Sequence, residues 1–221
     1  MPENVGSLGN DGAVPLQNRV LPTQEIVAEA GRGLLMGNRG TLHDPDRQLR
    51  TSRWRSKAWI CCVLDWRGVQ RDPMPPGRWT ALFFFDEATA LAAGHRPCAY
   101  CRRRDYLRYA GHWTSGRGLS ERPRAAVMDA QLHLERVEPH TRRQRTTVAD
   151  LSELPDGAMI WYDERPALVL GGKVLGWSWH GYAAPVEPPG RTQVVVLTPP
   201  SNLVVLQAGF APLLHPSANG N

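Results

Sequence analysis

The sequence lacks long apolar segments and has few cysteines, and each shortage excludes a class of protein. No run reaches the roughly 18 apolar residues that a membrane-spanning helix requires, so we expect no membrane span. The first 15 residues have neither the basic start nor the apolar stretch of a secretory signal, which indicates a cytoplasmic protein. Four cysteines among 221 residues in a reducing compartment favour metal ligation or core burial over a disulfide scaffold.

Several enzyme motifs are also missing. The chain has no G-x-S-x-G nucleophile turn and no H-E-x-x-H helix, so the ordinary esterase and zinc-protease classes have no support. The glycine-rich segment 31–40 fits neither the P-loop nor the dinucleotide-binding fingerprint. A Ser–His–Asp triad remains open, because the fold and not the spacing brings such residues together.

The chain is basic, with a formal net charge of +5, and hydrophobic residues make up 42% of it, as in a globular protein. The positive charge is concentrated in three clusters, interleaved with Trp and Tyr: WRSK (54–57), CRRRDYLRY (101–109) and HTRRQR (140–145). Such clusters can neutralise phosphates and stack on bases, or they can form a solvated arginine-rich surface. Nucleic acid is therefore the partner that we expect, and no membrane partner is expected.

The first half of the chain is predicted to begin with a flexible leader over residues 1–24 and a short helix over residues 25–36. Apolar and aromatic residues predict strands at 57–66 and 79–85. Asp86 is the predicted N-cap of a helix that stops at Gly94. A further helix is expected over residues 98–111, with Pro97 near its start.

The second half changes character. A helix is predicted over residues 124–137, followed by a small β-meander over 158–164, 166–172 and 173–182 and a strand at 193–200. Ser201 is the predicted cap of a last helix over 202–209. The fold class is therefore α+β. Residues 25–115 and 124–221 form either two regions, the latter of no family that we can name, or one packed unit.

Cys98 and Cys101 form a Cys-x-x-Cys pair, which places two sulfurs on one face of a turn where they can bind one tetrahedral ion. The N–H groups at the start of the following helix and the nearby arginines favour the thiolate form of these residues. Cys61 and Cys62, about 36 residues earlier, are the obvious source of further ligands. The sequence therefore predicts a metal site, and zinc is the expected ion.

The segment FFFDEATALAAGHRPCAYC, residues 83–101, resembles the closing part of the zinc-binding domain at the N-terminus of the Ada DNA-repair protein and its relatives. Those domains end with an aromatic strand, a short E-A-x-x-A-G helix and then R-P-C-x-x-C. The resemblance covers about residues 57–104. The matching positions here are Phe83, Phe84, Phe85, Glu87, Ala88, Ala93, Gly94, Arg96, Pro97, Cys98 and Cys101.

The resemblance implies a small zinc module that contacts DNA, with Cys98 and Cys101 as zinc ligands. It also implies an earlier, spaced pair of ligands, but Cys61 and Cys62 are adjacent. Neighbouring side chains of a strand point to opposite faces, so only one of the two is expected to reach the ion. This departure puts the methyl-transfer chemistry of Ada in doubt here.

A fourth ligand must then come from elsewhere in the chain. His43 is the preferred candidate, and His95, His112 and His133 are the alternatives. In the leading hypothesis, a zinc-dependent nucleic-acid-binding protein tied to DNA repair or processing, basic residues beside the zinc contact phosphate. These residues are Arg96, Arg102, Arg103 and Arg104.

A rival interpretation is a zinc enzyme, either a hydrolase or a nucleobase deaminase. Pro97-Cys98-x-x-Cys101 fits one half of the deaminase signature, and His133-Leu134-Glu135 has the H-x-E form of the other half. The order of the halves is reversed, so this interpretation requires a permuted chain in which His133 or Glu135 acts as acid or base. A third interpretation is an interaction protein that its zinc only stabilises.

Overall fold

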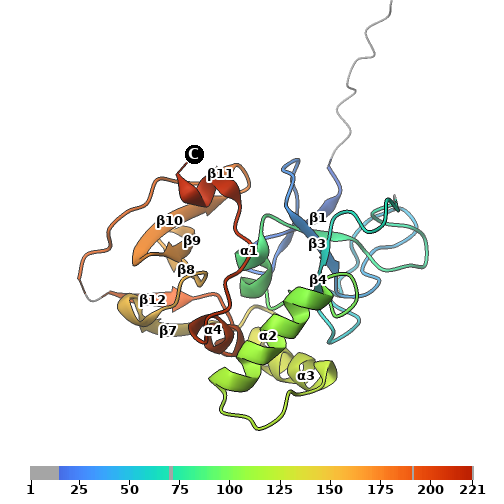
Figure 1. Cartoon of the computed structure of the whole chain (residues 1–221). Helices are drawn as coiled ribbons and strands as arrows, with labels where there is room; N and C mark the ends of the chain where they lie inside the picture. Colours follow the sequence, from blue (N-terminus) through green and yellow to red (C-terminus); the bar gives the residue numbers. More distant parts are fainter. Residues whose placement is uncertain (1–14, 70–71, 191, 221) are drawn as a thin grey trace, which may run out of the picture.

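Two six-stranded β-sheets form the body of the molecule, with helix α1 between them (Figure 1). The computed structural model describes residues 15–69, 72–190 and 192–220. The predicted α+β class is confirmed, since helices and both sheets are present in these ranges. No helix within them is long and apolar enough to cross a membrane.

The first sheet has the strand order β2-β1-β5-β3-β4-β6. Its strands are β1 (Gln17–Val20), β2 (Ile26–Ala28), β3 (Leu35–Asn38), β4 (Ile60–Val63), β5 (Leu82–Phe84) and β6 (Arg96–Pro97). The short strand β6 pairs in parallel with β4, and Cys61 lies opposite Pro97. This pairing brings the two cysteine pairs of the sequence next to each other.

The helix predicted over residues 25–36 is wrong, because this segment contains strands β2 and β3. Gly33 shows the reason: a Cβ there would lie 1.8 Å from the carbonyl oxygen of Phe84. The neighbouring Leu34 N–H donates to the Phe85 carbonyl, so the chain is held against β5. Non-local strand pairing overrides the local helical pattern here.

The leader predicted over residues 1–24 is ordered in its last part. Residues 1–14 lie outside the described residues. Strand β1, however, lies between β2 and β5, and Val20 is fully buried. The alternation along β1 buries Asn18 and Val20 on the inner face, which makes this segment part of the sheet.

The second sheet contains the predicted meander. Its order is β11-β10-β9-β8-β12-β7, and β8, β9 and β10 pair antiparallel in succession. The strands are β7 (Thr147–Asp150), β8 (Met159–Tyr162), β9 (Arg165–Leu170), β10 (Lys173–Ser178), β11 (Gly181–Tyr182) and β12 (Gln193–Val196). The sequence analysis missed β7, which is largely exposed and carries no run of apolar residues.

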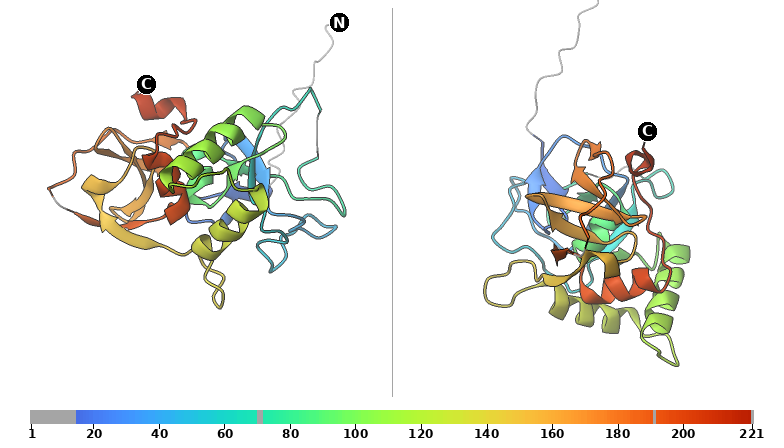
Figure 2. Two further views of the ribbon diagram at one scale, coloured as in Figure 1. Left: turned by 60° about the horizontal axis from the view of Figure 1, so that its bottom comes forward. Right: turned by 90° about the vertical axis from the view of Figure 1, so that its left-hand side faces the viewer.

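Helices α2 (Arg103–Gly116), α3 (Ala125–Arg136) and α4 (Pro200–Gln207) lie together on one side of the molecule, whereas α1 (Glu87–Ala92) is central (Figures 1 and 2). Asp86 caps α1 as predicted, accepting a hydrogen bond from the Thr89 N–H. The predicted cap of α4 is wrong: the helix begins at Pro200, and Ser201 donates to Glu135 from inside its first turn. Two 3₁₀ turns, Leu151–Glu153 and Pro216–Asn219, complete the chain.

The two sheets share an aromatic core next to α1. Phe85, directly after β5, packs edge-on against Trp177, Trp179 and Tyr182 of the β10–β11 hairpin, with ring centroids 5.5 to 6.1 Å apart. These three rings are buried, so they belong to the core. Trp161 differs from them, because 42% of its surface remains exposed.

Candidate metal centre

The sulfur atoms of Cys62, Cys98 and Cys101 all lie within 4.8 Å of one another. Cys62 comes from β4, and the other two come from the turn between β6 and α2. The Cys98 N–H donates to the Cys61 carbonyl at 2.8 Å, which extends the β4–β6 pairing into the turn. Three cysteines from two distant segments of the sequence thus form a group that can hold a metal ion.

Cys61 and Cys62 point to opposite faces of β4, as expected for neighbours in a strand. Cys61 is buried among the apolar residues of the first sheet and accepts a hydrogen bond from Arg102 Nη1 at 3.4 Å. Burial raises the pKa of the Cys61 thiol, which keeps this residue neutral. Only Cys62 of the adjacent pair therefore belongs to the sulfur cluster.

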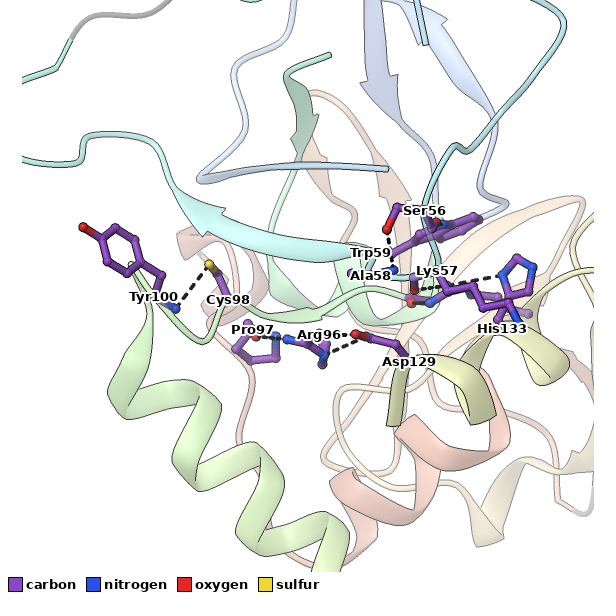
Figure 3. Close-up of polar contacts among 12 residues, drawn as sticks. Ser56, Lys57, Ala58, Trp59, Arg96, Pro97, Cys98, Tyr100, Asp129 and His133 are labelled. Atoms are coloured by element: carbon purple, nitrogen blue, oxygen red, sulfur yellow. Dashed lines mark hydrogen bonds and ion pairs between the residues drawn. The ribbon is translucent and has the colours of Figure 1, made fainter. Parts of the chain in front are cut away.

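The three clustered sulfurs have very different proton affinities. Hydrogen bonds from the thiols of Cys101 and Cys62 hold the pKa of Cys98 far below its usual range. The Tyr100 N–H, 3.4 Å from the Cys98 sulfur, also favours the thiolate (Figure 3). Donating to its neighbours raises the pKa of Cys62. The cluster therefore favours one thiolate even before a cation approaches, and a thiolate is the form that binds metal.

None of the described His, Asp or Glu side chains joins the three sulfurs as a fourth ligand. His43, the preferred candidate, contacts Thr80 Oγ1 at 2.7 Å and the Pro75 carbonyl at 3.0 Å. His95 is fully buried between Arg39 and the Ile60 carbonyl. Each imidazole has both ring nitrogens in use, and neither is part of the cluster.

The remaining histidine candidates also lie outside the cluster. His112 contacts the Ala208 carbonyl at 2.8 Å. His133 packs edge-on against Trp54, with ring centroids 5.5 Å apart. Burial, together with the charges of Arg136 and Lys57, lowers the pKa of His133 to about 4. Among the described residues, three sulfurs therefore make up the cluster.

The sulfur cluster opens onto a small cavity of about 270 Å³. Its other lining residues are mainly apolar or aromatic and include Trp66, Trp79 and Tyr100. Tyr100 is 71% exposed, and its ring lies 5.4 Å from that of Trp66. None of these three rings was among the predicted site residues, although Tyr100 lies inside the Cys-x-x-Cys pair.

Two of the four predicted phosphate contacts are buried in ion pairs. Arg96 donates from Nε and Nη2 to both carboxylate oxygens of Asp129 at 2.8 and 2.7 Å, and its side chain is 4% exposed (Figure 3). Arg102 lies 2.7 Å from Glu87 and 3.1 Å from Asp105. These two guanidiniums fasten the metal-site turn to α3 and α1, which leaves no free face for a phosphate.

Arg103 and Arg104 differ from the buried pair, because both are exposed in the first turn of α2. They follow directly after the metal-site turn. Of the predicted phosphate contacts, they are the two that the structure leaves free to meet an anionic partner.

His133 and Glu135 do not form a catalytic pair at the sulfur cluster. Two positions apart on α3, they point in different directions. Glu135 accepts hydrogen bonds from the Ser201 N–H at 2.8 Å and the Ser201 hydroxyl at 2.6 Å. Arg117 lies 3.4 Å from the same carboxylate. The carboxylate therefore joins α3 to α4, and the described residues do not assemble a permuted deaminase site.

No family model matches the chain, and comparison with curated proteins and with solved structures gave no match either. The resemblance of residues 57–104 to Ada-type zinc domains thus remains a prediction from the sequence. Evidence on the function of the chain therefore comes from the geometry of the sulfur cluster.

Proposed function

We propose that this protein is a zinc-dependent nucleic-acid-binding protein that acts in DNA repair or processing. The observation that carries this proposal is the cluster formed by Cys62, Cys98 and Cys101. Zinc–sulfur bonds of about 2.3 Å place tetrahedral ligand sulfurs about 3.8 Å apart, a spacing that fits inside this cluster. Thiolate ligands favour zinc over magnesium, calcium and manganese.

The zinc would join β4 to the turn that precedes α2. This link would fix the start of α2, where the exposed Arg103 and Arg104 lie. Tyr100 and Trp66 stand beside the same turn. Guanidiniums next to the exposed Tyr100 ring and the half-buried Trp66 ring are suited to a nucleic-acid strand, since cations neutralise phosphate and rings stack on bases.

Metal analysis of the purified protein tests the zinc site. We expect about one zinc per chain in the unmodified protein and loss of most of it in Cys98→Ser and Cys62→Ser. Cys61→Ser is the matched control, because Cys61 lies on the opposite face of the strand and should leave the zinc content unchanged. Equal zinc content in all three variants would contradict the proposed ligand set.

Fluorescence anisotropy with labelled single- and double-stranded oligonucleotides tests the nucleic-acid part. We expect binding that weakens as salt increases, and weaker binding still when Arg103 and Arg104 are both changed to Gln. Arg122→Gln serves as the control, since Arg122 is exposed in the loop between α2 and α3. No binding, or binding insensitive to salt, would remove this part of the proposal.

A zinc enzyme is the second candidate, and the three-ligand count favours it. Catalytic zinc sites keep one position open for water or substrate, and the cluster opens onto the 270 Å³ cavity. A chelator titration followed by circular dichroism separates the two roles. Unfolding on metal removal indicates a closed structural site, whereas a retained fold indicates an exchangeable, catalytic type of site.

A further inference from the structure

A larger cavity, of about 620 Å³, lies at the junction of the two sheets, away from the cysteines. Its walls come from the ends of β1 and β3, the segment before β4, the segment before β7, and strands β8 and β12. None of the three clustered cysteines lines it. Its volume falls in the range of ordinary small-molecule sites.

Positive charge dominates this cavity. Arg39, Arg53, Arg142 and Arg143 line it, whereas Glu25 is the only carboxylate among its lining residues. Arg142 and Arg143 are exposed at the rim, and Arg39 is buried at the base. Cations gathered in a cavity without matching carboxylates repel one another, so an anion would stabilise their arrangement.

Arg39 carries the strongest signal, because its guanidinium is buried and incompletely bonded. Its side chain donates from Nε to His95 Nε2 at 3.0 Å and from Nη1 to the Gln24 carbonyl at 3.2 Å. Its Nη2 is buried with no hydrogen-bond partner among the described residues. Burial, together with the charges of Arg136 and Arg53, lowers the pKa of Arg39. A buried cation with an unpaired donor is costly, and an anion in the adjoining cavity would offset part of that cost.

Aromatic rings stand beside this unpaired donor. The guanidinium carbons of Arg39 and Arg136 lie 4.0 and 3.9 Å from the ring centroid of Trp59. Trp54, half-buried, lies 6.1 Å from Trp59, and the exposed Trp161 faces the cavity from the other sheet. Figure 3 shows Trp59 and His133 well separated from Cys98 and Tyr100, so this aromatic group is distinct from the metal centre.

We propose that this cavity binds a nucleotide unit, with a phosphate held by the rim arginines near the buried charge of Arg39 and an unpaired base stacked on Trp54 or Trp161. Guanidinium forks match phosphate oxygens, and indole rings provide stacking surfaces for any base. A base inside a duplex is not free to stack in this way. The unit is therefore either a free nucleotide or part of a single strand.

Isothermal titration calorimetry with three probes tests the assignment: AMP, a short oligothymidine and inorganic phosphate. We expect AMP or the oligothymidine to bind at least about tenfold more tightly than phosphate, since base stacking adds to the phosphate contacts. Whichever of the two binds more tightly identifies the source of the unit. No binding of either at millimolar concentration, or binding no tighter than that of phosphate, overturns the proposal.

Arg39→Gln should weaken binding by about tenfold or more through loss of the charged donor. Because Arg39 packs on Trp59, this variant can also perturb the fold, so Trp54→Ala and Arg143→Gln provide independent tests at positions that are less buried. Arg122→Gln, far along the chain in an exposed loop, should bind as the unmodified protein does. Unchanged affinity in both Arg39→Gln and Trp54→Ala overturns the proposal.

The same variants keep this cavity separate from the proposed zinc function. Arg39→Gln should retain its zinc, and the variant with both Arg103 and Arg104 changed to Gln should retain AMP binding in the cavity. Loss of zinc binding and loss of nucleotide binding can therefore be told apart, because each is measured in a variant that leaves the other site unchanged.

Discussion

Individual buried charges hold the metal-site turn in place. The pair between Arg96 and Asp129 joins β6 to α3, and the pair between Arg102 and Glu87 joins the start of α2 to α1. Both pairs involve arginines next to the cysteines in sequence. Because ions removed from water are costly unless they are paired, each of these side chains depends on its partner.

Asp129→Asn should destabilise the protein by about 3 kcal/mol, because it leaves the Arg96 guanidinium buried without a counter-charge. Urea unfolding monitored by tryptophan fluorescence measures this change. The double variant Arg96→Met with Asp129→Leu is the control, and it should cost less than the single change. A single variant as stable as the unmodified protein would contradict the structural role of this pair.

Two histidines make stability depend on pH. Burial, then the charge of Arg39, lowers the pKa of His95 well below its ordinary value. The pKa of His133 is lowered to about 4, mainly by burial. The unfolded chain therefore binds more protons than the folded chain below the ordinary value of 6.5. The stability that the two neutral histidines contribute is fully present above pH 6.5 and is lost as the pH falls toward 4.

The melting temperature, measured from pH 7.5 down to pH 4.5, should therefore decrease. His133→Gln should make this decrease in melting temperature smaller, since it removes one of the two titrating histidines. His140→Gln, at an exposed turn after α3, should leave it unchanged. The same decrease in melting temperature in the unmodified protein and in both variants would show that His133 does not contribute.

At the scale of elements, helix α1 connects the two sheets through its cap. The Asp86 carboxylate accepts hydrogen bonds from the Thr89 N–H at 2.9 Å, the Tyr182 hydroxyl at 2.7 Å and the His215 N–H at 3.2 Å. One residue thus caps the helix and also fixes β11 and the C-terminal segment. The residues of α1 are all buried, so the helix is a core element despite its six-residue length.

Asp86→Ala should cost about 2–3 kcal/mol, because it removes the cap and leaves the buried Tyr182 hydroxyl without an acceptor. Thermal unfolding measures this loss. Asp44→Ala is the matched control: Asp44 accepts two backbone hydrogen bonds in an exposed turn, where water can replace it. Equal losses in the two variants would argue against a bridging role for Asp86.

At the scale of the whole molecule, the N-terminal and C-terminal halves depend on each other. Phe85 is covered by rings of the second sheet. Gln144 Nε2 lies within hydrogen-bond distance of the carbonyls of Pro22, Ala92 and Leu197, which belong to three different parts of the chain. Separation of the halves would expose apolar surface and leave these carbonyls without their donor.

The fragment 15–116, which retains β1 to α2, should therefore lack cooperative unfolding on its own. Circular dichroism during urea titration measures this, with the protein of residues 15–220 as the control. A sigmoidal transition in the fragment would show instead that the zinc region is an independent domain.

Local pattern was sufficient for much of this architecture. Cys98-x-x-Cys101 predicted two of the three clustered sulfurs, Asp86 and Gly94 bounded α1, and closely spaced turn residues indicated the meander. Such features depend on residues a few positions apart, whose relative placement the backbone geometry sets. The α+β class followed from them.

Contacts between distant segments required the folded structure. The choice of Cys62 over Cys61, the burial of Arg96 and the strands at 26–28 and 35–38 depend on which partner each segment meets. The cavity around Arg39 draws its walls from six segments that no spacing relates. The spacing of residues in the sequence determines which way their side chains point from one helix or strand. Metal ligation, burial and cavity formation depend instead on how the helices and strands pack against one another.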